Sequence, residues 1–493
     1  MLARYRTDLL LALLALVCAQ TWNRLNLHAM LEAPYARYNV RGERVLTATD
    51  DASYLQAVDR WLGDRPDLQG PQHARPDLRA PGYRLWYLLP RLVLDPLPAQ
   101  SVLVWLQCLL YSASVALLWE VLLFHGMVVW LRWSIALLFA VMPTFHGFLF
   151  HTLSEGVTPA LSLSVLGCAM LAPRSRTWLW AALALWSLLM VTRPALAWVG
   201  LALLPALFAN FHPPKAIALV LLALAPTATW WVGNCVKAGG ILGLHPVYRA
   251  DEPGITRPTH SAFWELAKSW GARGDGFHPV MEGAYRAALE CDTASVYAQP
   301  FTLLAPEGSL RPEQYLAVRN AFSAWQRFTC TQLAPALASP AGTIAHTTPE
   351  EQRIITELEG ITRAWRHEHF WYHHVRVPLR VLKQLVAHSN LNLFLFQSEW
   401  RGKPLMEGLR WASAALHVGL FAGLLFALML RVPASVRWCA AGALFYVAYL
   451  CYVQRGVEER YTLPVLYLCM CIAPFAVKAL AGTNFATPKT ARP

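Results

Sequence analysis

The sequence predicts an all-α polytopic membrane protein, in which a bundle of about ten transmembrane helices carries a mostly helical extracytoplasmic domain. Of its 493 residues, 56% are hydrophobic, and the mean hydropathy of +0.34 is too high for a soluble domain of this size. Apolar runs close to the roughly 20 residues that cross a bilayer recur along the chain. Two long polar segments, at about 23–99 and 235–407, separate these runs into groups.

The first apolar run follows Arg4 and Arg6 and resembles a signal peptide, but no small-x-small cleavage site closes it, so we expect a retained signal-anchor helix. The chain then divides into a membrane module at 1–234 that includes the first outer loop, an extracytoplasmic domain at 235–407, and C-terminal helices with a tail at 408–493. The predicted spans are 8–22, 100–124, 133–150, 157–172, 177–192, 195–210, 216–234, 408–430, 438–453 and 462–482.

The distribution of basic residues predicts the orientation of the chain. With the N-terminus in the cytoplasm, the short cytoplasmic loops and the tail contain Lys or Arg but neither Asp nor Glu. Both long polar segments then face outward, and both termini are cytoplasmic. The basic residues of these loops and the tail are Arg132, Arg174, Arg176, Lys215, Arg431, Arg437, Lys489 and Arg492.

The net charge of +12 does not indicate nucleic-acid binding, because no nucleic-acid-binding pattern accompanies it and many arginines lie at membrane boundaries. Membrane lipids and lipid phosphates are the expected partners there. Most of the ten cysteines fall inside spans. Cys291 and Cys330 lie well inside the outer segment, where they could either pair in an oxidising compartment or remain free.

Two adjacent acids, Asp50 and Asp51, follow the first span in the stretch TATDDASYLQAVDRW. Thr47 or Thr49 could cap a helix that begins here, and the acids would then only stabilise its first turn. The alternative is a general base at the membrane surface, kept reactive by a neighbour of like charge. The residues alone leave both interpretations open.

Arg75 and Arg79 lie in ARPDLRAPGYRLWYLLP, where two prolines and a glycine bend the chain before an apolar helix. They either anchor the chain at the interface or bind phosphate, for which a guanidinium group is well suited.

Four more polar stretches fall at the outer ends of predicted spans. Glu155 in FHTLSEGVTPAL is costly there unless hydrated or paired, which favours a functional role. Arg193 stands in VTRPAL, and the indoles of ATWWVGN are more typical of a membrane belt than of a site. The last loop, RGVEERYTLP, concentrates charge beside Arg460 and Tyr461. Because all these stretches meet at one face, they predict a site for an amphiphilic, phosphate-bearing substrate.

The histidines of RHEHFWYHH include the pair His369 and His373 at helical metal-ligand spacing. No HExxH or CxxC motif accompanies them, so a metal site is the weaker interpretation and an interfacial helix in HFWYHHVRVPLRVLKQLV the stronger one. No cofactor is indicated, although a divalent metal remains an option. The chain also contains no GxGxxG and no P-loop, so a soluble nucleotide site has no support.

In order and spacing these motifs resemble the class C (GT-C) glycosyltransferases, including bacterial members akin to the lipid A aminoarabinose transferase and the protein O-mannosyltransferases. The resemblance rests on the acid pair, RAPGY, SEG, TRP, WWVGN and ERYTLP, and it covers about 45–235 and 400–480. The outer domain resembles no family. Two departures stand out: Leu78 replaces an acid found in aminoarabinose transferases, and no Trp-Trp-Asp motif is present.

The resemblance implies an integral membrane glycosyltransferase of the bacterial inner membrane, with its active site on the extracytoplasmic face. Such an enzyme moves a sugar from a polyprenyl-phosphate donor to an envelope lipid, polysaccharide or protein, usually with inversion. Residue by residue, Asp51 or Asp50 falls on the general base and Glu155 on a second acidic position. The positions implied to contact the donor phosphate are Arg79, Arg193, Arg460, Tyr461 and Arg75.

Two rival classes remain. An O-antigen ligase or polymerase would also use arginines on a lipid-linked pyrophosphate glycan, but it would not need the acid pair. A polytopic transporter would need polar residues near the middle of the membrane, whereas the spans here are almost free of charge at their centres.

Overall fold

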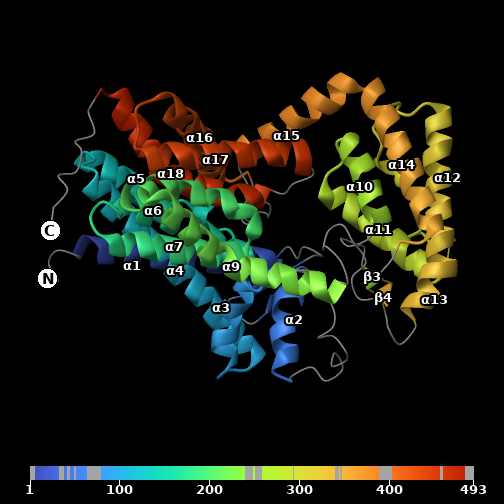
Figure 1. Ribbon diagram of the computed structural model, residues 1–493, viewed down its shortest axis with the longest axis horizontal. Coiled ribbons are helices and arrows are strands. Elements are labelled where there is room, and N and C mark those ends of the chain that lie inside the picture. The colour runs from blue at the N-terminus through green and yellow to red at the C-terminus, as the bar shows by residue number, and fades with distance from the viewer. Residues whose placement is uncertain are drawn as a thin grey trace.

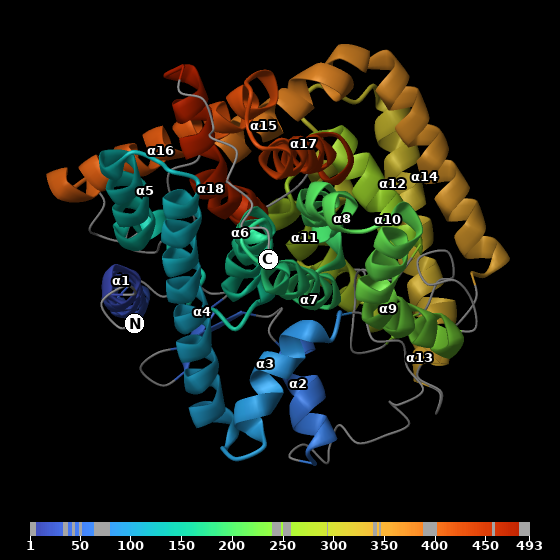
Figure 2. The same ribbon diagram turned by 60° about the vertical axis from the view of Figure 1, so that its left-hand side comes forward.

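The computed structural model is built almost entirely of helices and is that of an all-α polytopic membrane protein (Figure 1). Apolar helices form one bundle, and the helices of the larger polar segment lie beyond one end of it (Figures 1 and 2). The structure describes residues 6–32, 38–41, 45–48, 52–63, 79–238, 248–249, 258–292, 294–338, 343–344, 347–387, 402–455 and 459–482.

Seven helices in the described part of the chain are long and apolar enough to cross a membrane. Three of them run on from neighbouring turns: α6 begins after a 3₁₀ turn from Ser154, α17 continues as a π-helix to Gln454, and α18 follows a 3₁₀ turn from Glu459. These helices are α1 (Arg6–Glu32), α4 (Pro96–Phe124), α6 (Thr158–Leu171), α9 (Pro213–Ala238), α16 (Pro404–Met429), α17 (Ala434–Tyr449) and α18 (Leu463–Leu480).

The other predicted spans correspond to shorter apolar helices, namely α5 (Val129–Val141), α7 (Arg176–Thr192) and a 3₁₀ helix that leads into α8. The prediction of one span over 133–150 was wrong, because the helix ends at Val141 before Pro143, which has no N–H to donate to a continuing helix. The 3₁₀ stretch, Pro194–Leu203, is drawn out, since this geometry rises about 2 Å per residue. α8 (Leu204–Asn210) completes it.

The first helix is longer than predicted. α1 reaches Glu32, ten residues past the predicted end at 22, because its polar continuation packs on the bundle: Asn26 and Met30 are buried. Figures 1 and 2 place the start of α1 and the end of α18 at the same end of the bundle, away from α10–α14.

The polar segment between α1 and α4 holds a small hairpin and two helices. Strand β1 (Tyr38–Arg41) pairs antiparallel with β2 (Val45–Ala48), and α2 (Ala52–Trp61) and α3 (Gly82–Arg91) follow. α2 packs through an apolar face at Tyr54, Leu55 and Val58, which are buried, whereas Trp61 is 64% exposed.

The outer domain has a core of its own, built around aromatic rings such as those of Phe263, Trp270, Trp325 and Trp365. Two short strands, β3 (Tyr248–Arg249) and β4 (Thr343–Ile344), pair antiparallel at its edge. The last two helices of the domain, α14 and α15, are joined through a π-helix at Tyr372–Arg376. The helices are α10 (Pro258–Ser269), α11 (Gly274–Leu289), α12 (Pro312–Phe328), α13 (Ala334–Leu337), α14 (Pro349–Glu368) and α15 (Val377–Val386).

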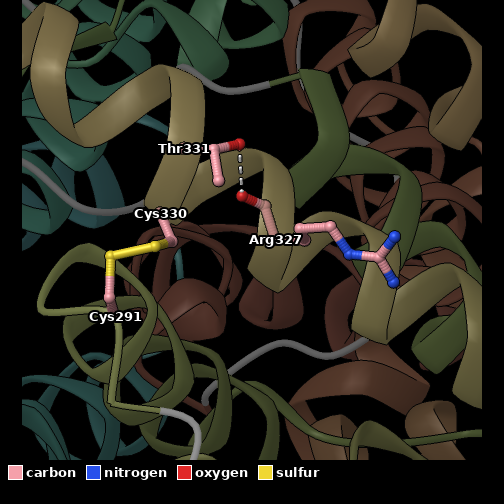
Figure 3. Close-up of a disulfide and its surroundings, with 4 residues drawn as sticks. All are labelled: Cys291, Arg327, Cys330 and Thr331. Atoms are coloured by element: carbon pink, nitrogen blue, oxygen red, sulfur yellow. Dashed lines mark hydrogen bonds between the residues drawn. A yellow bond between two sulfur atoms is a disulfide. The ribbon is translucent and has the colours of Figure 1, made fainter.

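A disulfide joins two helices of this outer domain. Cys291, just after α11, pairs with Cys330 in the π-turn that continues α12 (Figure 3). The same turn is held by a hydrogen bond of 2.9 Å from the Thr331 hydroxyl to the Arg327 carbonyl. The sequence left the pairing open, and the structure shows the two cysteines joined.

The outer domain is tied to the bundle by two basic residues. The Lys268 ammonium group donates to the Val453 carbonyl at 3.1 Å. The Arg455 guanidinium donates to Nδ1 of His373 at 2.7 Å and to the carbonyl of the same residue at 3.0 Å. Since Val453 and Arg455 lie at the end of the π-helix that continues α17, these contacts fix the outer domain to the end of that helix.

Candidate functional site

A cavity of about 200 Å³ lies beside the Glu459–Thr462 turn before α18, which also contacts α15. Five separate segments form it: α2, the residues just before α3, the turn before α6, the junction between α7 and the 3₁₀ helix, and the turn before α18, with one residue added from α9. Its lining consists of Tyr54, Arg79, Ala80, Leu153, Ser154, Glu155, Thr192, Arg193, Pro194, Ala195, Trp230, Arg460 and Tyr461.

Glu155 is the centre of the charged part of this cavity. Its Oε1 lies 2.8 Å from Nη1 of Arg193 and 3.6 Å from Nε of Arg460, while its Oε2 accepts a hydrogen bond of 3.1 Å from the Ser154 hydroxyl. Only 5% of the Glu155 side chain is exposed. Ion pairing with a carboxylate at this position holds both arginines in place.

Aromatic rings support the arginines from the side. The Tyr461 ring faces the guanidinium groups of Arg193 at 4.7 Å and Arg460 at 5.6 Å, measured to the ring centroid. The Arg79 guanidinium lies 5.2 Å from the ring centroid of Tyr54. Such contacts favour a cation over an aromatic face and restrict where the long side chains can move.

Close packing brings the segment that follows Arg79 against the end of α7. A Cβ on Gly82 would lie 2.6 Å from the backbone nitrogen of Thr192, so only glycine allows the two backbones to approach this closely. Because Arg79 precedes Gly82 by three residues and Arg193 follows Thr192, this contact brings both arginines to the lining of one cavity.

Gln107 of α4 braces the turn that carries Glu155. Its amide nitrogen donates to the carbonyls of Leu149 at 2.9 Å and His151 at 3.0 Å, and its oxygen accepts from the Tyr83 hydroxyl at 3.1 Å. A Cβ on Gly156 would meet that oxygen at 2.0 Å. The amide therefore sets the path of the chain from Leu149 to Gly156, and with it the place of the carboxylate.

The predicted acid pair, Asp50 and Asp51, lies outside the described residues, as does Arg75. The described residues on either side of the pair both reach the same turn. The Leu46 N–H donates to the Phe150 carbonyl at 3.1 Å, and the Tyr54 hydroxyl lies 3.4 Å from the Ser154 hydroxyl. The chain thus enters and leaves the acid pair beside the segment that bears Glu155.

Five residues predicted from far-apart stretches line the one cavity. These are Arg79, Glu155, Arg193, Arg460 and Tyr461. Arg455 of the same charged loop lies elsewhere and contacts His373.

Several residues of the cavity were not predicted. Trp230 lines it, although its indole was interpreted as a belt residue, and Tyr54, Ser154 and Thr192 also line it. For Tyr54, Ser154 and Thr192 the signal in the sequence is adjacency, since each lies within three residues of Asp51, Glu155 or Arg193. Gln107 has no such signal.

Among the described residues, no group of three or more His, Cys, Asp and Glu side chains is arranged to hold a metal. His373 faces the Arg455 guanidinium, and burial followed by that positive charge lowers the pKa of its imidazole to about 3. His369 instead packs on the ring of Trp365, with centroids 4.5 Å apart. The two histidines therefore have different surroundings and do not converge.

Comparisons with models of protein families, with curated proteins and with solved structures found no match to this chain. The interpretation of the cavity therefore rests on its own geometry. Three arginines from distant segments, one carboxylate that orients two of them, and two tyrosine rings form a site that can bind a phosphate group at the end of a membrane bundle.

Proposed function

We propose that this protein is an integral membrane glycosyltransferase that moves a sugar from a polyprenyl-phosphate donor to an acceptor of the bacterial cell envelope. The observation that carries the proposal is the convergence of Arg79, Arg193 and Arg460 on one cavity at the end of an apolar bundle. Guanidinium groups bind phosphate oxygens through paired hydrogen bonds, and the bundle surface would receive the lipid chain. The active site would face the extracytoplasmic side.

In this mechanism the acceptor hydroxyl oxygen attacks the anomeric carbon, and the bond from that carbon to the phosphate oxygen breaks. The departing phosphate carries the electron pair as an anion, so it needs no general acid. Arg193 and Arg460 would stabilise the charge that develops on it. Attack opposite the leaving group inverts the anomeric centre.

The proton of the acceptor hydroxyl would pass to Asp51 or Asp50. Glu155 fits the role of base less well, because its carboxylate already pairs with Arg193 at 2.8 Å and accepts from the Ser154 hydroxyl at 3.1 Å. We propose instead that Glu155 orients Arg193 and Arg460. It would act as a base only if its contacts with Arg193 and Ser154 were broken.

The proposal is tested with purified protein in detergent, a panel of polyprenyl-phosphate sugars and a panel of envelope acceptors. We expect release of polyprenyl phosphate that disappears in Asp51→Asn or Asp50→Asn and falls strongly in Arg193→Gln. Glu155→Gln should raise the KM for the donor more than it lowers kcat, because it frees the arginines without removing the base.

Three outcomes would redirect the assignment. Loss of kcat in Glu155→Gln with full turnover in both aspartate variants would make Glu155 the base. Cleavage of pyrophosphate-linked glycans alone would favour a ligase or polymerase. Movement of the lipid-linked sugar across the membrane with no bond broken would indicate a transporter.

A further inference from the structure

The helical segment 370–386, which consists of the π-helix, α15 and the two residues before them, joins the outer domain to the bundle and has two exposed stripes of side chains. Trp371, Leu379 and Leu382 form an apolar stripe, and Trp371 is 74% exposed. Arg376, Arg380 and Lys383 form a basic stripe at the adjacent helical positions, also exposed. We call these six residues the 371–383 ridge. An apolar stripe beside a basic one is the pattern of a helix that lies in a membrane interface.

The opposite face of this helix is fixed to the bundle. Val381 and Leu385 are buried within the same apolar core as the membrane helices. α15 also contacts α16 and the π-helix at Leu450–Gln454 that ends α17. The ridge therefore sits at the rim of the bundle, and Figure 1 shows α15 running from the ends of the bundle helices towards α14.

The basic stripe has no acidic partner within the described part of the chain. Arg376 and Arg380 lie near the ring of Tyr372, at 5.7 Å and 5.9 Å from its centroid, and neither they nor Lys383 pairs with a described carboxylate. Three unneutralised cations beside an exposed indole match a surface that is anionic on the outside and apolar beneath.

We propose that the 371–383 ridge docks on the bilayer and binds the headgroups of anionic phospholipids in the leaflet next to the outer domain. Trp371 would lie among the headgroups, and Leu379 and Leu382 would reach the acyl boundary. The continuity of the ridge with the bundle favours lipid over a protein partner, because the bilayer surrounds the same rim. α15 also contacts the turn at Glu459–Thr462, so docking holds the outer domain beside Arg460 and Tyr461.

The experiment uses the full chain in two kinds of liposome. One is phosphatidylcholine alone, and the other also contains about 30% phosphatidylglycerol as the anionic probe. The photo-crosslinker p-benzoylphenylalanine is introduced at Trp371 or Leu379. A matched control carries it at Leu316 on α12, which is 55% exposed but lies in the outer domain away from the bundle. Mass spectrometry then identifies each adduct.

We expect phospholipid adducts at Trp371 and Leu379 and far fewer at Leu316. Substitution of the basic stripe, as Arg376→Gln, Arg380→Gln and Lys383→Gln, should lower the share of adducts formed with phosphatidylglycerol towards its share of the bulk bilayer, which is a fall of up to about threefold when all three bases are removed. Adducts to another polypeptide, equal adducts at Leu316, or no dependence on the anionic lipid would each overturn the proposal. Unchanged thermal unfolding of the variants would show that they fold.

Discussion

At each end of the helical bundle an arginine pairs with a glutamate, and the two pairs differ in burial and surroundings. At the cavity, Arg193 pairs with Glu155 at 2.8 Å, and Arg460 lies on the same carboxylate oxygen. At the opposite end, Arg174 pairs with Glu120 at 2.9 Å, with 29% of the arginine side chain exposed.

The two arginine–glutamate pairs therefore have different roles in the structure. The more exposed pair closes a short turn between α6 and α7 against α4, and solvent reaches its arginine. The buried pair fixes a cation on the wall of a cavity, where replacing a partner leaves an unbalanced charge. Under the proposed function, the charge at the cavity end serves a ligand, whereas the charge at the other end holds the turn.

The largest expected effect separates these two pairs. Arg193→Gln should lower donor turnover by about 10²–10³-fold, because one group that stabilises the leaving phosphate is lost. It should also destabilise the protein by about 3–5 kcal/mol, since Glu155 loses its nearest cation. Arg174→Gln should cost less than about 1 kcal/mol and leave turnover unchanged. Turnover and thermal unfolding of both variants check this, and equal losses would remove the distinction between the two ends.

The second prediction separates the outer domain from the bundle. Cys291→Ser with Cys330→Ser opens a loop with a sequence separation of 39, which should destabilise the outer domain by about 4 kcal/mol. Because this domain has its own core, amide exchange should rise across α11 and α12 and stay unchanged in α4 and α6. Faster exchange throughout the bundle would show that the two cores unfold together.

The third prediction compares two buried glutamines of α4. Gln107→Leu leaves the carbonyls of Leu149 and His151 without their donor, so we expect a loss of about 3–4 kcal/mol and lower turnover. Gln100→Leu is the matched control, because the side-chain oxygen of Gln100 is buried and makes no hydrogen bond within the described structure. It should cost about 1 kcal/mol at most. Similar losses in thermal unfolding would mean that Gln107 does not brace the turn.

The same contrast explains what could be predicted from the sequence. Glu155, Arg193 and Arg460 were predicted because a charge at the end of an apolar run is costly and therefore conspicuous. Gln107 was not, since one neutral amide inside a span looks like any other, and Gln100 seven residues earlier has no such role. Its importance depends on which carbonyls the fold places opposite it, and local spacing carries no such information.

The fold shows the same limit. The apolar runs predicted nearly every membrane helix, but 133–150 breaks at Pro143 and α1 continues to Glu32. Hydropathy reports which residues avoid water, whereas helix ends depend on backbone hydrogen bonds and on tertiary packing. The small β-hairpin before the acid pair was missed for a related reason, because Leu46 pairs with a segment about 100 residues away.

The smallest effect concerns a buried acid outside the membrane segments. Glu351 in the first turn of α14 is fully buried, and its only described side-chain hydrogen bond comes from the Thr259 hydroxyl, at 3.2 Å. Burial raises the pKa of this carboxyl to about 7 from 4.5. As pH rises, the Glu351 carboxyl ionises at a lower pH in the unfolded chain than in the folded one. The folded state therefore loses up to about 3 kcal/mol of stability between about pH 4.5 and pH 7.

Glu351→Gln should therefore stabilise the outer domain at pH 8 and leave it almost unchanged at pH 4.5, because the amide keeps the bond from Thr259 and never ionises. Glu357→Gln, at an exposed position of the same helix, is the matched control. The pKa of His373 is lowered to about 3, so this residue destabilises the fold below about pH 6.5 in both proteins and cancels in the difference. Thermal unfolding at the two pH values checks the prediction. An equal gain at pH 4.5 and pH 8 would mean that packing, and not the charge of the buried carboxylate, decides the effect.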